Sequence, residues 1–201
     1  MKSRVLLVLI MVSTLMGCSS TELEERCFPM LVAVGYEDRN VTYEMAYPKD
    51  GGMLQFDANG IDFKESKEKY EERLNKEADY NHLKVLVFEE DFLEHTESYK
   101  SMLDYLAEIE DFPRNTYVCV VDDIEDLLEL EERLSQDLGT YLEEYLKQQE
   151  DGKTYLLTLG DLMDEKDNQD MVFYLPYLEI EDNFIEWKGY VNTSGKTWKD
   201  F

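Results

Sequence analysis

Short apolar segments alternate with charged segments of helical periodicity through the middle of the chain, and this alternation limits the fold most. Residues 83–88 and 116–121 are apolar runs of a length typical of buried strands. Residues 64–79 and 96–109 carry apolar side chains at helical spacing among charged ones. The order helix, strand, helix, strand, helix predicts an α+β or α/β domain with a mixed β-sheet and packed helices.

Two antiparallel hairpins are expected to flank this middle region. Residues 28–36 are apolar, and residues 41–47 alternate apolar with polar side chains after a short turn. The buried face of the second segment is expected to carry Val41, Tyr43, Met45 and Tyr47. Residues 172–180 and 184–191 form the second predicted hairpin, so antiparallel pairs should lie on both sides of the central elements.

Several side chains predict where helices begin and end. Thr96 is a candidate N-cap, and Asp122 or Asp123 can cap a helix whose apolar face continues to residue 138. Gly139 indicates a break before a further helical segment that reaches residue 149. Thr158 is expected to cap one or two helical turns in the apolar segment that follows.

The first eighteen residues have the form of an export signal. Lys2 and Arg4 precede the mostly apolar segment 5–16, which is shorter than the roughly 20 residues that a membrane span requires. Leu-Met-Gly-Cys then ends at Cys18, an order typical of bacterial lipoprotein signals. A thiol at this position forms the thioether to diacylglycerol. We therefore predict lipidation at Cys18, the alternative being an ordinary signal peptide with a chance cysteine.

This signal divides the chain into three parts. We predict a lipoprotein signal peptide at 1–17, a lipidated tether at 18–25 and a single domain at 26–201. Two acyl chains such as palmitate give stable anchoring in a bilayer. The expected location is the outer face of the bacterial cytoplasmic membrane, or the spore inner membrane if the organism sporulates.

The acidity of the chain excludes one class of partner. It has 46 acidic and 20 basic residues, and removal of Lys2 and Arg4 with the signal leaves a net charge of −28. Nucleic acid requires a basic surface and is therefore a poor partner. An anionic bilayer would also repel the domain, so the lipid on Cys18 must hold it at the membrane.

A search for catalytic and metal-binding motifs returns none. His82 and His95 are the only histidines, and no HExxH motif, phosphate-binding glycine loop or nucleophile elbow occurs. Asp164, Asp167 and Asp170 recur at intervals of three, which is not the spacing of a calcium loop. We predict a solvated acidic loop there, and no catalytic residue, metal or cofactor in the chain.

Three further expectations concern cysteines, acidic pairs and the C-terminus. Cys27 and Cys119 lie in apolar segments, which favours buried free thiols, although export leaves a disulfide open. The pairs 131–132 and 143–144 are glutamates expected on solvent-facing helix surfaces. In the polar tail 193–201, Trp198 and Phe201 are either aromatics that dock on a partner or part of a frayed end.

The order of several motifs resembles the N-terminal domain of the Ger(x)C family, the lipoprotein subunit of spore germinant receptors. After Cys18, residues 31–36 form a first apolar strand that ends near a glycine. Residues 81–90, Asn-His-Leu-Lys-Val-Leu-Val-Phe-Glu-Glu, are similar to a family segment, and residues 113–118 resemble its next strand. The motifs that follow in the family's order are at 141–142, 158–162, 175–176 and around Gly189.

The resemblance implies a non-enzymatic subunit that works beside multi-span membrane receptor partners and is needed for the response to small nutrient germinants. It supplies no catalytic residue. His82, Leu83 and Lys84 match its motif, although a strand start in the core is the favoured explanation for them. Family members usually continue into further domains, whereas this sequence ends at Phe201. The alternatives are a free-standing surface lipoprotein and a solute-binding lipoprotein of a transporter.

Overall fold

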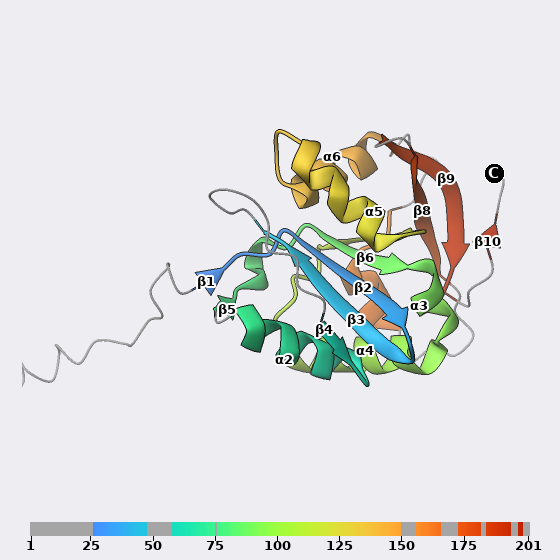
Figure 1. Ribbon diagram of the computed structural model, residues 1–201. Coiled ribbons are helices and arrows are strands. Elements are labelled where there is room, and N and C mark those ends of the chain that lie inside the picture. Colours follow the sequence, from blue (N-terminus) through green and yellow to red (C-terminus); the bar gives the residue numbers. More distant parts are fainter. Residues whose placement is uncertain are drawn as a thin grey trace, which may run out of the picture.

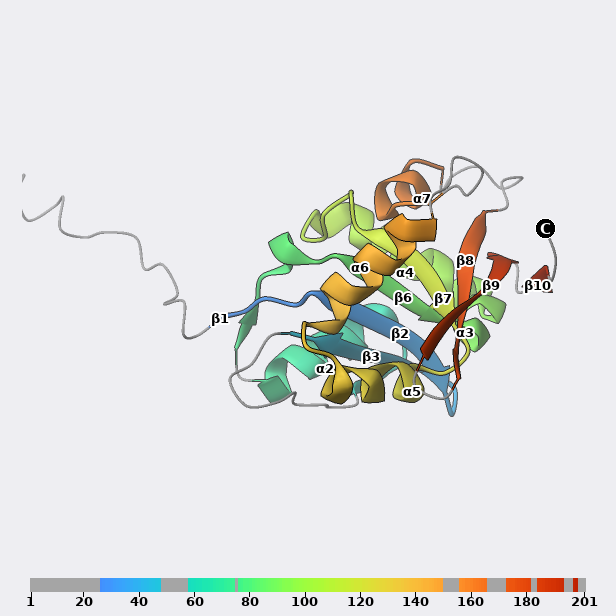
Figure 2. The same ribbon diagram turned by 90° about the horizontal axis from the view of Figure 1, so that it is seen from above.

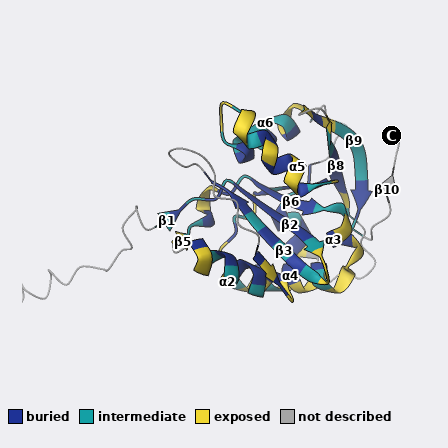
Figure 3. Cartoon of the chain, in the orientation of Figure 1, coloured by how far each residue is buried: buried dark blue, intermediate teal, exposed yellow. Residues whose placement is uncertain are grey.

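The computed structural model shows a mixed β-sheet packed between helices, an α+β fold, as predicted (Figure 1). The residues that the structure describes are 26–47, 58–74, 76–149, 156–165, 173–181, 184–193 and 197–198. Most residues of the central strands are buried, whereas exposed residues gather on the outer faces of the helices (Figure 3). The sheet therefore supplies the core, and the helices separate it from solvent.

The main sheet has eight strands, and parallel strands form its centre. In spatial order they are β10 (Thr197–Trp198), β9 (Phe184–Asn192), β8 (Tyr174–Glu181), β7 (Tyr117–Val121), β6 (Val85–Glu89), β2 (Leu31–Glu37), β3 (Asn40–Ala46) and β4 (Ala58–Gly60). Strands β2, β6, β7 and β8 are parallel, while β2–β3 and β8–β9 are antiparallel hairpins. The prediction of flanking hairpins is thus confirmed.

Helices cover both faces of this sheet (Figure 2). One face packs against α2 (Phe63–Leu74), α3 (Glu90–Glu94), α4 (Thr96–Ile109) and α7 (Leu159–Glu165). The other packs against α5 (Ile124–Glu129), the 3-10 turn η3 (Leu130–Arg133) and α6 (Leu138–Gln149). Because the central strands β6 and β7 are buried on both sides, their sequences are almost entirely apolar rather than alternating.

Alternation along the strands sends neighbouring residues into different cores. Leu86 and Phe88 of β6 belong to the α2–α4 side, whereas Val85 and Val87 belong to the α5–α6 side. Leu86 lies directly opposite Val118 of β7, so the two apolar segments form neighbouring core strands. On β3 the predicted face is also correct, since Val41, Tyr43, Met45 and Tyr47 are buried.

The helix expected over residues 64–79 is wrong at its C-terminal end. Helix α2 stops at Leu74, and Glu77–Ala78 instead forms β5, which pairs in parallel with β1 (Arg26–Cys27). The Asp79 N–H donates to the carbonyl of Cys27 at 2.8 Å, and Arg26 lies 3.3 Å from the Asp79 carboxylate. These backbone and ionic contacts to the start of the domain outweigh helix propensity in a segment with few apolar side chains.

The structure tests the predicted caps individually. Asp123 caps α5 by accepting the Asp126 N–H at 3.1 Å, as predicted. Thr158 also caps α7, because its hydroxyl accepts the Asp161 N–H at 3.4 Å, while the Asp161 carboxylate accepts the Thr158 N–H at 2.8 Å. Thr96 is not the cap of α4: His95 occupies that position without a side-chain cap, and its ring stacks on Tyr36 at 3.5 Å.

Gly139 lies inside α6 and does not break the helix. The break falls at residues 134–137, and Asp137 starts α6 by accepting the Thr140 N–H at 2.8 Å. A Cβ atom at Gly139 would lie 2.3 Å from the carbonyl oxygen of Met30. The glycine therefore allows close approach of α6 to the chain that leads into β2, a reason that local sequence does not reveal.

Gly189 has a different role, in the β8–β9 hairpin. Its φ is 123°, a region that L side chains rarely adopt, and it lies opposite Tyr177, beside a register shift at which Lys188 is the extra residue. The preceding Lys188 is within 3.4 Å of the carboxylates of Glu179, Glu181 and Glu186. The glycine thus forms a β-bulge, and the lysine neutralises part of the acidic hairpin.

Candidate functional site

A polar groove of about 440 Å³ lies between α2, the C-terminal end of α4 and the 3-10 turn η2 (Tyr80–His82). We call it the acidic groove. Its lining residues are Lys67, Glu71, Glu77, Ala78, Asp79, Tyr80, Asn81, Glu110 and Asp111. Five of the nine are carboxylates, so the groove has the opposite charge from a site for phosphate or nucleic acid.

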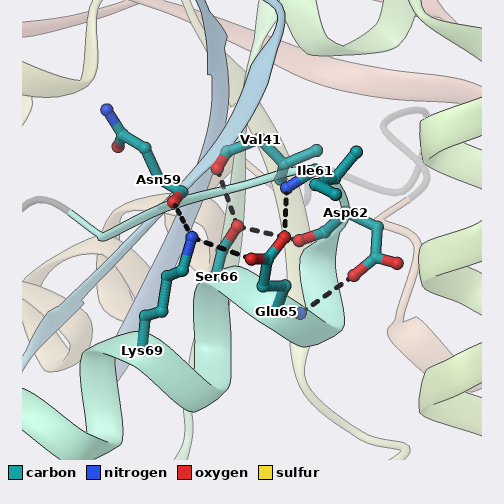
Figure 4. Close-up of polar contacts among 7 residues, drawn as sticks. All are labelled: Val41, Asn59, Ile61, Asp62, Glu65, Ser66 and Lys69. Atoms are coloured by element: carbon teal, nitrogen blue, oxygen red, sulfur yellow. Dashed lines mark hydrogen bonds and ion pairs between the residues drawn. The ribbon is translucent and has the colours of Figure 1, made fainter.

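Helix α2 supplies one wall of the groove, and its start is fixed by a set of hydrogen bonds (Figure 4). Asp62 Oδ1 accepts the Glu65 N–H at 2.9 Å, and Glu65 Oε2 accepts the Ile61 N–H at 2.7 Å. The hydrogen bond from the Ile61 N–H is the main reason that the pKa of Glu65 lies below its usual value. The buried Ser66 hydroxyl lies 2.7 Å from the carbonyl of Val41. These contacts set how α2 is rotated against the sheet.

In this orientation, α2 places Lys67 and Glu71 in a series of linked polar groups beneath the groove. Lys67, whose side chain is 8% exposed, places Nζ 2.9 Å from Glu71 Oε1. The Tyr80 hydroxyl donates to Glu71 at 2.7 Å and lies 2.9 Å from the Tyr43 hydroxyl. Burial raises the pKa of Tyr43 and Tyr80 well above the usual tyrosine value. Both hydroxyls therefore stay protonated, and Tyr43 donates to Tyr80.

The floor of the groove is aromatic and its rim is acidic. The Tyr80 ring stacks on the buried Phe112 ring at 4.3 Å, and Lys67 Nζ lies 5.2 Å from the centre of the Tyr80 ring. Glu110 ends α4 in the left-handed conformation, with φ of 52°, which brings the exposed Glu110 and Asp111 to the rim. The Tyr80 ring is therefore covered by Phe112 and Lys67, and the exposed part of the groove is its acidic rim.

Sequence reasoning did not find this groove. Carboxylates are so numerous in the chain that no pair was distinctive, and residues 77–79 were assigned to a helix. A local indication was available at Asp79, whose carboxylate accepts the Asn81 N–H at 3.1 Å. An aspartate favours such a turn, but this signal lies at the predicted end of the helix and does not reveal the earlier end at Leu74.

A second group of polar residues lies at the carboxyl ends of the parallel strands. Glu89 accepts the backbone N–H groups of Ile124 and Tyr36, while burial, the largest effect, raises its pKa. A Cβ atom at Gly35 would lie 2.6 Å from Glu89 Oε2, so the glycine makes room for this carboxylate. Glu89 therefore joins β2, β6 and α5 and has a structural role.

The motif residues His82, Leu83 and Lys84 lie at the start of β6. The His82 ring meets the edge of Phe28 at 5.7 Å, Leu83 is buried in the core, and Lys84 Nζ is 3.6 Å from Glu143. Met30 accepts the Lys84 N–H through its carbonyl at 2.9 Å. These contacts favour the explanation that the motif begins a core strand and fixes α6 against it.

Two glutamates expected in water are partly buried. Glu143 is 18% exposed and lies between Lys84 and Lys147, which explains why it turns inward. Glu131 is half-buried, and its Oε2 has no hydrogen-bond partner among the described residues. Burial, together with the nearby Asp137 carboxylate, raises the pKa of Glu131 to about 7. The paired residues Glu132 and Glu144 are exposed, as predicted.

Glu131→Gln should stabilise the protein at pH 8. The pKa of Glu131 is raised from about 4.3 in an unfolded chain, so the folded state favours the protonated form. The stability that this form contributes is complete below about pH 4.3 and is lost as the pH rises through about 7. We expect a gain of on the order of 1 kcal/mol at pH 8 and little change at pH 5, measured by denaturant unfolding. Equal effects at both pH values would contradict this assignment.

The described structure also places the remaining candidate residues. Cys27 and Cys119 are buried and free, as favoured, and lie in different cores. Asp164 pairs with Arg114, whereas Asp167 and Asp170 lie outside the described residues. Within the described part of the chain, no cluster of three or more histidine, cysteine, aspartate or glutamate side chains could hold a metal.

Both ends of the sequence contain predictions that fall outside the described residues. They are the signal peptide at 1–17, the tether at 18–25 with Cys18, and Phe201. Trp198 belongs to β10, so the expected polar tail contains a short strand that pairs with β9. None of the helices in the described ranges has the length and apolar character needed to cross a membrane.

Comparison with known proteins connects this fold to a family. A family model described as the spore germination protein N-terminal domain matches residues 19–180. The chain belongs to this family. The matched range contains every residue of the acidic groove and extends into β8. Searches of curated proteins and of solved structures found no match.

Membership of the spore germination family confirms the resemblance to the Ger(x)C N-terminal domain. It supports a role related to germinant receptors, and the family is not a known family of enzymes. The residues of this domain that match the family motifs lie where strands begin, cap helices, or connect one secondary-structure element to another. The match is therefore explained by residues that build the fold.

Proposed function

We propose that this protein is a lipid-anchored, non-enzymatic subunit of a germinant receptor, held at the membrane through Cys18 and acting with multi-span membrane partners. The family match carries this proposal: it begins at residue 19, directly after the predicted lipidation site. A germination domain that starts at the residue following the lipid has the arrangement expected of a membrane-attached receptor subunit.

The start of the domain supports an attachment close to the bilayer. Only residues 19–25 separate Cys18 from β1, and seven residues span at most about 25 Å when extended. The pairing of β1 with β5 and the contact of Arg26 with Asp79 fix the chain to the domain at that point. The lipid would therefore hold one end of the domain near the outer face of the cytoplasmic membrane, or the inner membrane of a spore.

Charge favours a protein partner over the lipid surface. A mature chain with a net charge of −28 is repelled by anionic lipids, and this repulsion acts over about 8 Å at physiological salt. Basic loops of a membrane protein would instead attract it, and complementary charge mainly governs encounter rate and choice of partner. The proposed complex should accordingly form more readily at low salt.

The absence of enzymatic activity is supported by the contacts of the acid–base candidates. Glu89 accepts two backbone N–H groups, Glu90 accepts the Tyr177 hydroxyl at 3.2 Å, and the ring of His95 stacks on Tyr36. These groups stabilise the junctions of strands and helices. The two glutamates use hydrogen bonds within the fold, and the His95 ring is packed against an aromatic side chain.

Purification of the full-length protein from native spore membranes tests the proposal. After mild crosslinking at low salt, multi-span membrane proteins should be recovered with it, and their yield should fall as salt rises. The Cys18→Ala variant serves as the control and should recover much less of them. Recovery of the wild-type protein alone, from membranes that contain receptor-type subunits, would favour a free-standing surface lipoprotein.

A further inference from the structure

We infer that the domain faces the bilayer with the edge of the sheet at which the parallel strands begin, and that this edge meets the lipid headgroups. We call it the entry edge, formed by residues 26–30, 76–84 and 110–116, which lead into β2, β6 and β7. The inference rests on the proposed function, because it uses the lipid on Cys18. Two independent features of the fold support it: the point at which the tether joins the domain, and the difference in charge between the two ends of the sheet.

The tether joins the domain at the entry edge. Residue 26 begins β1, which continues into the segment that leads to β2, and β1 pairs with β5 ahead of β6. Because β2, β6 and β7 are parallel, their first residues lie along one edge of the sheet. Figure 1 shows β1 and β5 at this end of the sheet and α3 at the other. A lipid on Cys18 would therefore keep the entry edge within about 25 Å of the bilayer surface.

Charge differs between the two ends of these strands. The three entry segments carry four basic and four acidic residues, so their net charge is zero. The segments that leave the same strands form the opposite edge, which we call the exit edge: residues 37–40, 89–95 and 122–126. They carry one basic and ten acidic residues, a net charge of −9. An anionic bilayer therefore repels the exit edge and has little effect on the entry edge.

The entry edge also carries side chains suited to the headgroup region. Lys147, exposed near the end of α6, places Nζ 5.5 Å from the centre of the Tyr117 ring at the start of β7. The exposed His82 ring meets the edge of the partly buried Phe28. Ammonium groups and aromatic rings are common where proteins meet lipid headgroups, because their polar ends remain in water while their apolar parts approach the acyl chains. The entry edge can therefore approach lipid that repels the exit edge.

The two features together orient the domain. The surface charge of the bilayer acts over about 8 Å at physiological salt, which is shorter than the extended tether. Rotations that bring the exit edge this close to anionic lipid are opposed, whereas rotations that bring the entry edge close are not. The entry edge should therefore lie toward the lipid, and the exit edge should point away from the membrane.

Fluorescence quenching by lipid tests this orientation. The full-length, lipidated protein is reconstituted in vesicles of equimolar phosphatidylglycerol and phosphatidylcholine, with a quencher on a fraction of the headgroups. A fluorophore is attached at His82→Cys on the entry edge or at Glu125→Cys on the exit edge, both of which are exposed positions. Cys27 and Cys119 are buried, so they should not take the label.

Quenching at residue 82 should exceed quenching at residue 125 by about threefold at low salt, and this ratio should fall as salt rises. Lys76→Glu with Lys147→Glu adds negative charge to the entry edge and should lower the ratio about twofold. Lys64→Glu with Lys100→Glu is the matched control and should not lower it, because these residues lie near the starts of α2 and α4, toward the exit edge. Both pairs of substitutions should leave the unfolding temperature close to that of the wild type.

Other outcomes would overturn the inference. Equal quenching at the two positions, or stronger quenching at residue 125, would show that the entry edge does not face the lipid and would leave the proposed function standing. A photoreactive amino acid at residue 82 that captured only protein in native membranes would show that a partner, rather than lipid, covers this edge. Failure of the wild-type protein to float with the vesicles would instead contradict the lipid anchor and, with it, the proposed function.

Discussion

Leu86→Ala should lower the free energy of unfolding by about 3 kcal/mol. Leu86 is completely buried on β6, between Val32 of β2 and Val118 of β7 in the sheet register. Removal of its side chain leaves a cavity that flanking strands, fixed by their own hydrogen bonds, cannot fill. Denaturant unfolding followed by circular dichroism measures the loss.

A matched apolar substitution on the surface gives the comparison. Ile61 is 79% exposed, at the turn before α2, so Ile61→Ala should change the unfolding free energy by less than about 0.5 kcal/mol. If the two variants lost similar amounts of stability, Leu86 would not lie in a packed core. Such a result would contradict the central position of β6 in the sheet.

Cys18→Ala should abolish incorporation of a fatty-acid probe. Only the Cys18 thiol follows the predicted signal at the position where the thioether to diacylglycerol forms. The variant should also retain its signal peptide or be cleaved elsewhere, which changes its mass. Metabolic labelling followed by electrophoresis measures the first effect, and mass spectrometry of the purified chain measures the second.

The other two cysteines provide the control for this experiment. Cys27 and Cys119 are buried, and burial raises the pKa of both thiols, to about 11 and about 12 respectively. Cys27→Ala and Cys119→Ala should therefore leave labelling unchanged. A Cys18→Ala variant that still carried the probe would exclude the proposed anchor and the attachment of the domain that depends on it.

The central sheet could be predicted because its evidence lies in local sequence. The strands β6 and β7 are short apolar runs, and β3 alternates so regularly that each buried side chain of the face was named correctly. The hairpins followed from the turns between such segments. Family membership was recognisable for a similar reason, since motifs that start strands and helices keep their order along the chain.

The errors arose where distant parts of the chain decide the outcome. Gly139 resembles a helix break, but the nearby carbonyl of Met30 explains it. Residues 77–78 form a strand because β1 pairs with them, and Glu143 turns inward because Lys84 of another element reaches it. The acidic groove combines α2, η2 and the end of α4, so no single segment could reveal it.

Germination of spores that lack this protein tests the central claim most directly. The fall in optical density of a spore suspension after addition of each nutrient germinant measures the response. Spores without the protein should lose the response to at least one germinant, and the wild-type gene should restore it, whereas the Cys18→Ala gene should restore it poorly. Full and equally rapid responses of the deficient spores to every germinant would contradict a role for this domain in a germinant receptor.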